Sequence, residues 1–152
     1  MKRHVHIISG CLLALAAFTT SSFASQLVEM RLALDKPSDG AEPMTLGKET
    51  LYVQKKALLD QTDLRSVAVS TNMPVAAPQV GLVFLFTDKG AQHLSEVSRQ
   101  NEGKRLAVVI DGQIVSAPTI QQISDGVLEF HGPFTEQRAC DIAVKVDKML
   151  QR

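Results

Sequence analysis

Aromatic residues are scarce in this chain of 152 residues, which has no tryptophan, one tyrosine and six phenylalanines. This scarcity argues against a surface on which nucleic-acid bases stack. The 16 lysines and arginines equal the 16 aspartates and glutamates, so there is no basic excess to neutralise phosphates. Apolar residues make up 45% of the chain and charged residues 21%, which is typical of a globular domain. We therefore expect one folded domain and no nucleic-acid partner.

Long apolar runs are also absent, and the run Cys11–Phe18 falls short of the roughly 20 residues that span a bilayer. Lys2 and Arg3 precede this run, and the small residues of Ser22-Phe23-Ala24 follow it. A basic start, a short apolar core and small residues before a break are typical of a secretory signal peptide. The pattern predicts that residues 1–24 are removed by cleavage after Ala24 and that the mature chain is periplasmic.

A lipoprotein is the alternative, because Ile8–Cys11 is similar to a lipobox whose cysteine would carry the lipid. Most of the apolar core follows Cys11 rather than preceding it, which favours cleavage after Ala24. Cleavage there would leave Cys140 as the single cysteine. An internal disulfide would then be impossible, so a hydrophobic core must stabilise the mature chain.

Alternating and continuous apolar patterns predict a series of short strands. We expect a loop at 35–43 and one helical turn at Gln61–Leu64. Asp111-Gly112 predicts a two-residue hairpin turn, because such turns need positive φ angles, and Pro118 is expected to end the second strand of that hairpin. The expected strands are 27–34, 51–53, 65–71, 80–86, 106–110, 113–116 and 127–131.

Two amphipathic helices are expected among these strands. Thr87 is a suitable N-cap for the first helix, and Gly103 is a suitable stop. Thr135 is a suitable N-cap for the second helix. An apolar stripe at helical spacing follows it, made of Ala139, Ile142, Ala143, Val146 and Leu150.

The order of elements predicts an α+β fold, with a mainly antiparallel β-sheet and the two amphipathic helices packed on one face. Residues 25–50 should contribute an N-terminal strand and loop to the same globular unit as residues 51–152. No internal repeat is visible.

Reactive side chains do not form a recognisable catalytic or metal-binding pattern. His93 and His131 are interpreted as surface or edge residues, because no second histidine or cysteine is spaced to share a metal with either. Cys140 flanks the apolar stripe of the last helix, which predicts partial burial. Asp111 and Asp141 have structural explanations, and Lys104-Arg105 reads as a solvated strand start. We therefore predict no catalytic residue, no metal site and no cofactor.

Several spaced motifs together resemble the head subdomain of the first periplasmic region of SecD and SecDF. They are 86–91 (FTDKGA), 101–112 (NEGKRLAVVIDG), 115–120 (VSAPTI) and 132–139 (GPFTEQRA), and the resemblance extends over about residues 51–150. The motifs contain six residues with roles that look structural, namely Thr87, Gly103, Asp111, Gly112, Pro118 and Thr135.

The resemblance implies an exported module that acts in protein export by binding protein or unfolded polypeptide. The motor activity of SecD-like proteins depends on membrane helices, which this sequence does not show. Partner contact is expected at Met73, Pro74 and Val75 and at Thr119, Ile120 and Gln121, from position and composition alone. An enzyme inhibitor, or a small-ligand or envelope structural module on the same scaffold, is the alternative function.

Overall fold

The computed structural model describes residues 26–72 and 79–152, which form eight strands, two α-helices and one 3-10 turn. Their order is β1 (Val28–Leu34), β2 (Ala41–Leu46), β3 (Glu49–Asp60), η1 (Gln61–Asp63), β4 (Leu64–Asn72), β5 (Gln79–Phe86), α1 (Asp88–Gln100), β6 (Arg105–Ile110), β7 (Gln113–Ser116), β8 (Val127–His131) and α2 (Glu136–Leu150). No helix in these described ranges is long and apolar enough to cross a membrane.

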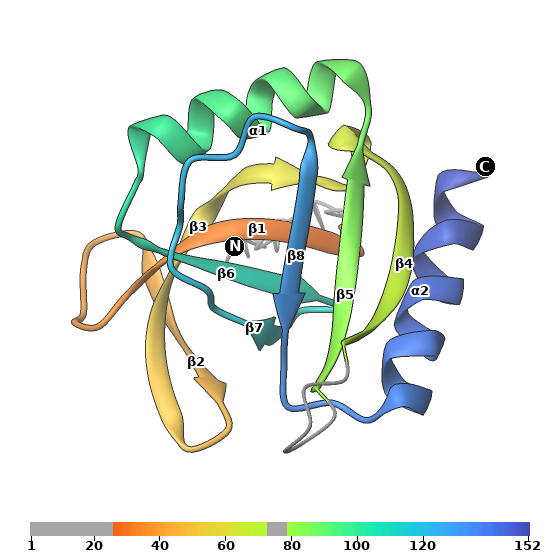
Figure 1. Cartoon of the computed structure of the whole chain (residues 1–152). Helices are drawn as coiled ribbons and strands as arrows, with labels where there is room; N and C mark the ends of the chain where they lie inside the picture. Colours follow the sequence, from red (N-terminus) through yellow and green to blue (C-terminus); the bar gives the residue numbers. More distant parts are fainter. Residues whose placement is uncertain (1–25, 73–78) are drawn as a thin grey trace, which may run out of the picture.

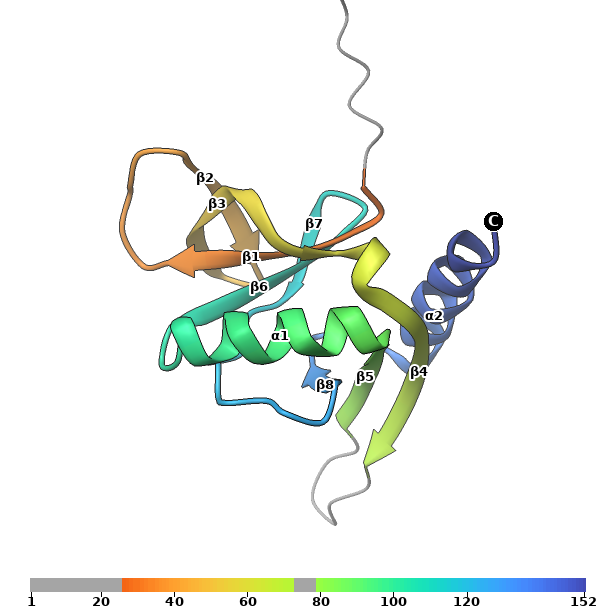
Figure 2. The same ribbon diagram turned by 90° about the horizontal axis from the view of Figure 1, so that it is seen from above.

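The strands form two antiparallel sheets that face each other, as Figures 1 and 2 show. One sheet has the order β2-β3-β1-β6-β7 and the other has the order β4-β5-β8. Both helices contribute buried side chains to the core between the sheets, with α2 alongside β4 (Figure 1). The α+β class is thus confirmed. The strands are divided between two sheets, however, where the sequence predicted one.

The corner between β3 and β4 separates the two sheets. At η1, the backbone N–H of Thr62 donates to the Asp60 carboxylate at 2.7 Å, and the N–H of Asp60 donates to the Asp63 carboxylate at 3.1 Å. This reciprocal capping box satisfies two backbone donors where the chain leaves the first sheet. The predicted helical turn at Gln61–Leu64 is therefore confirmed, and it redirects the chain into the second sheet.

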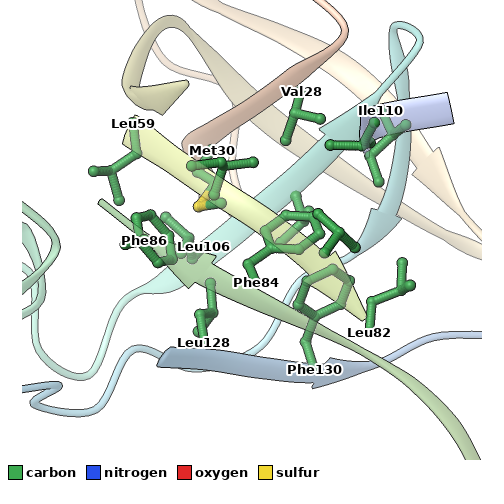
Figure 3. Packing of buried hydrophobic residues seen from close by; sticks show 14 of the residues in the cluster. Val28, Met30, Leu59, Leu82, Phe84, Phe86, Leu106, Ile110, Leu128 and Phe130 are labelled. Carbon is green, nitrogen blue, oxygen red and sulfur yellow. The ribbon is translucent and has the colours of Figure 1, made fainter. Parts of the chain in front are cut away.

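The main core lies between the sheets, where alternate residues of the strands point inward (Figure 3). Phe84 of β5 and Phe130 of β8 pack edge to face, with ring centroids 5.0 Å apart and planes at 85°. Met30 of β1 is fully buried opposite them. Burying one such side chain stabilises a fold by about 1.5–3 kcal/mol, so this layer is a main source of stability.

A second, smaller cluster lies on the other face of the five-stranded sheet. It includes Leu51 and Val53 of β3, Val109 of β6 and Ile114 of β7. β3 and β6 therefore bury side chains on both faces, which explains the continuous apolar run of β6. The sheet curls so that its edge strands, β2 and β7, approach each other.

Helix α1 begins against the β3–β4 corner. Both the backbone N–H and the hydroxyl of Thr87 donate to the Asp63 carbonyl, at 2.9 and 3.2 Å, and the Thr87 hydroxyl accepts from Gly90 N–H at 3.0 Å. A Cβ at Gly90 would overlap the same carbonyl. The predicted N-cap is confirmed, and the glycine that follows it permits a close backbone contact.

Most sequence-based predictions of elements are confirmed, and three local ones are corrected. Residues 41–43, expected in the loop at 35–43, belong to β2 (Ala41–Leu46), and β3 extends over 12 residues instead of 51–53. Cys140, expected to be partly buried, is exposed. It follows Ala139 by one residue, which rotates it about 100° around the helix and away from the apolar stripe.

Candidate binding site

A hollow of about 320 Å³ lies where three separate parts of the chain meet. We call it the α2 pocket. The turn after β2, the strand β7 and the segment entering α2 form its walls. Its apolar lining consists of Leu46, Ile114, Val115, Pro133, Phe134 and Ile142. Gly47, Gln113, Thr135 and Arg138 complete the lining, so the site offers polar as well as apolar surface. Such a concave site can take an apolar side chain of a partner beside polar groups.

Tight packing at Gly132 brings Phe134 into the wall of the α2 pocket. A Cβ at Gly132 would overlap both the Phe134 ring and the carbonyl oxygen of Val115. The absent side chain therefore lets the segment before α2 approach β7. Thr135 then caps α2, accepting a hydrogen bond from the Arg138 N–H at 3.3 Å.

A second hollow of about 520 Å³ lies on the other side of β7, between the two edge strands of the five-stranded sheet. We call it the β2–β7 pocket. Glu42, Pro43 and Met44 of β2 line it, and it shares Gln113 and Ile114 with the α2 pocket. The short strand β7 is therefore flanked by two openings.

Ion pairs hold the walls around these openings. Arg105 of β6 donates to both oxygens of Glu49 at 2.6 and 3.0 Å, which ties the turn after β2 to β6. This hydrogen bonding lowers the pKa of Glu49 and raises the pKa of Arg105. The predicted solvated strand start is thus half right, because Lys104 is exposed while Arg105 is largely covered and paired.

A partly buried charge cluster borders the β2–β7 pocket. Arg31 of β1 donates to Glu42 at 2.9 Å and to Glu29 at 2.5 Å, and only 15% of its side chain is exposed. Its Nε atom has no hydrogen-bond partner among the described residues. Truncating either acid should therefore be costly, because a buried guanidinium would lose its compensation.

A third hollow, of about 390 Å³, lies between β3 and α1 and has a charged rim that includes Lys56, His93 and Glu96. His93 is exposed and its Nδ1 lies 3.2 Å from the Asp63 carboxylate. His131 is also exposed, which confirms the surface interpretation of both histidines. In the parts of the chain that the structure describes, no three His, Cys, Asp or Glu side chains gather in a metal-binding arrangement.

The residues with predicted structural roles occupy those roles. Asp111 and Gly112 both have positive φ, 54° and 72°, as the hairpin turn between β6 and β7 requires. Gly103 has φ 79° just after α1, and Pro118 follows β7, its carbonyl accepting from Leu106 N–H. Asp111 also pairs with Lys145 of α2.

Of the predicted partner-binding residues, the described ones, Thr119, Ile120 and Gln121, do not line the α2 pocket or the β2–β7 pocket. Met73, Pro74 and Val75 lie outside the described residues. Thr119 and Gln121 are exposed after β7, whereas Ile120 is only 5% exposed and packs in the main core. Partner contact at these positions stays a prediction. The α2 pocket escaped sequence reasoning because its lining comes from separate segments with no shared motif.

Fold and site together define an α+β domain with an open pocket, lined by apolar and polar residues, beside an edge strand. A family model described as "SecDF, P1 head subdomain" matches residues 26–148. The chain belongs to this family. The family match begins at residue 26, whereas the resemblance noted in the sequence begins at about residue 51. The additional residues include β1 and β2, which are strands of the five-stranded sheet.

Named relatives agree with the family match. The protein translocase subunit SecDF of Thermus thermophilus is 35% identical over 117 residues, covering 76% of this chain and 14% of that protein. SecD of Aquifex aeolicus is 30% identical over 129 residues, covering 77% of this chain and 25% of the relative. The chain thus corresponds to a quarter or less of either relative.

Solved structures support the fold. A crystal structure of SecDF in a super-membrane-facing form has a TM-score of 0.62 at 24% identity, covering 80% of this chain and 18% of that one. A structure titled as a SecDF membrane component that enhances protein export has a TM-score of 0.61 at 23% identity, covering 80% and 61%. At this identity the likeness defines the architecture only.

Proposed function

We propose that this chain is a periplasmic, non-enzymatic binding module that contacts polypeptide or envelope protein partners in the context of protein export. Membership of the SecDF P1 head family supports the export context, since the named relatives are translocase subunits. The function of such a module depends on a surface that takes side chains of a partner rather than on a reactive centre.

The α2 pocket is the observation that carries this proposal. Its lining combines six apolar residues with the exposed end of α2. A hollow of this kind lets a partner remove an apolar side chain from water. Phe134 is half-buried in the absence of any partner, so an incoming side chain would cover surface that the fold itself leaves accessible.

A binding assay with an unfolded polypeptide tests the proposal. The mature protein, purified after export, would be titrated with a fluorescently labelled, permanently unfolded reporter chain, and binding followed by anisotropy. Phe134→Ala removes pocket lining and should weaken binding several-fold. Val144→Ala is the matched control, because Val144 is an apolar α2 residue that is 53% exposed and does not line the pocket. Equal binding by all three proteins, or none by the parent, contradicts the proposal.

Localisation is tested separately by mass spectrometry of the exported protein. Cleavage after Ala24 would give a mature chain that begins at Ser25. A mature chain that begins at a lipid-modified Cys11 would replace the signal-peptide interpretation with the lipoprotein alternative. Partner contact by Met73–Val75 and by Thr119–Gln121 is tested by replacing each segment with Gly and Ser in the same binding assay.

A further inference from the structure

The α2 pocket has one charged residue in its lining, and that residue is Arg138. Neither aspartate nor glutamate lines it, whereas the adjoining β2–β7 pocket includes Glu42. Arg138 lies in the first turn of α2, beside the apolar wall formed by Phe134 and Ile142. The pocket therefore combines apolar surface with a single positive charge at its rim.

The guanidinium of Arg138 makes no hydrogen bond or ion pair with another described residue. Arg31 and Arg105, by contrast, are each bound to carboxylates of the same five-stranded sheet. Arg138 is exposed, and its five N–H donors are available to a planar acceptor such as a carboxylate. Glu136 of the same turn is also exposed, but it is not part of the pocket lining.

Addition of a partner's strand to a sheet edge is hindered at two edge strands, β2 and β4. Pro43 interrupts the outer edge of β2, because its nitrogen carries no hydrogen to donate. At the far sheet, the Asp147 carboxylate of α2 accepts from Val67 N–H at 3.2 Å and so occupies an edge donor of β4. Recognition through side chains in the α2 pocket does not meet these obstacles.

We propose that the α2 pocket selects extended polypeptide segments in which an apolar side chain is adjacent to an acidic one. The apolar side chain enters between Phe134, Ile114 and Ile142, and the neighbouring carboxylate binds Arg138. This inference rests on the proposed function and adds a charge preference to it. Because Arg138 is solvent-exposed, the preference should be modest, about 1.5-fold to fivefold in Kd.

Matched peptides test the charge preference. Three labelled peptides would share a Gly/Ser frame with a central Leu-Asp, Leu-Asn or Leu-Lys pair. Their ends would be acetylated and amidated, so that the central aspartate supplies the only carboxylate. The parent protein should bind the Leu-Asp peptide most tightly and the Leu-Lys peptide least tightly. Arg138→Glu should reverse this order, and Arg138→Gln should abolish it.

Lys148→Glu is the matched control, because it makes the same charge change in the last turn of α2, outside the pocket. It should keep the parent order. Melting temperatures of all variants establish that they fold. Equal affinities for the three peptides, or an order unchanged by Arg138→Glu, overturn the charge preference while leaving polypeptide binding intact. Failure of every peptide and of the unfolded reporter chain to bind overturns both.

Discussion

Several residues of the sequence motifs serve to permit one particular backbone geometry. Gly90 lets the first turn of α1 touch the Asp63 carbonyl, and Asp111-Gly112 supplies the two positive φ angles of the β6–β7 turn. Neither role involves chemistry with a partner. These motif residues therefore serve the backbone. The motif 132–139 also contains the pocket residues Phe134 and Arg138, but the motif alone does not show that they line a pocket.

Gly90→Ala should destabilise the protein by about 1–3 kcal/mol, the usual range for forcing an extra carbon into a well-packed site. The added methyl would overlap backbone, which cannot move aside as a flexible side chain can. Chemical denaturation measures the free energy of unfolding. Gln92→Ala, at an exposed position of the same helix, should change it by less than about 0.5 kcal/mol. Equal stability of the two variants would show that the α1 contact has been misjudged.

The two helices differ in how their first turns are connected to the rest of the fold. Both α1 and α2 begin at a threonine that caps the first turn. The hydroxyl of Thr87 also donates to Asp63, so this cap connects α1 to the corner between the sheets, whereas Thr135 caps only its own helix. The two caps look alike in the sequence and differ in their tertiary contacts.

Replacing each cap by alanine separates these roles. Thr135→Ala should cost about 1 kcal/mol, the usual loss for a cap. Thr87→Ala should cost more, because a second hydrogen bond, to the Asp63 carbonyl, is lost with it. Thr87→Ser keeps both hydrogen bonds and should recover most of the stability in thermal unfolding. A larger loss for Thr135→Ala than for Thr87→Ala would contradict this interpretation.

The whole molecule depends on the corner that directs the chain from one sheet into the other, and the charge of Asp60 stabilises that corner. Partial burial acts to raise the pKa of Asp60, but hydrogen bonds from the side chain and backbone of Thr62 and from Gln26 outweigh it. The net effect is a pKa below the ordinary value of about 3.9. Folding therefore favours the ionised carboxylate.

Stability should consequently fall as the solution is acidified below about pH 4. The contribution of Asp60 is complete above its unfolded-state pKa and is lost as the pH drops through the lower pKa of the folded state. Asp60→Asn should be less stable than the parent protein at neutral pH, and the difference should shrink towards pH 2–3. Unfolding measured across this range checks the sign, and a gap that widens in acid would contradict it.

The element pattern was largely predictable from the sequence, as β8, α1 and α2 show. Local hydrophobic periodicity and caps determine where such elements begin and end. The strand β2 was missed because its proline and glutamate are unusual in strands, and long-range pairing with β3 overrides that weak local preference. The exposure of Cys140 was missed because its place beside the apolar stripe was taken as evidence of burial.

The sequence by itself determined the composition, the hairpin turn, the two capped helices and the family resemblance, because each depends on neighbouring residues or on spacing along the chain. Only the tertiary structure decided that the strands form two sheets and that Leu46, Ile114, Phe134 and Arg138 share one pocket. The physical reason is that strand pairing and pocket walls join residues far apart in the chain. No local preference encodes which distant surfaces meet.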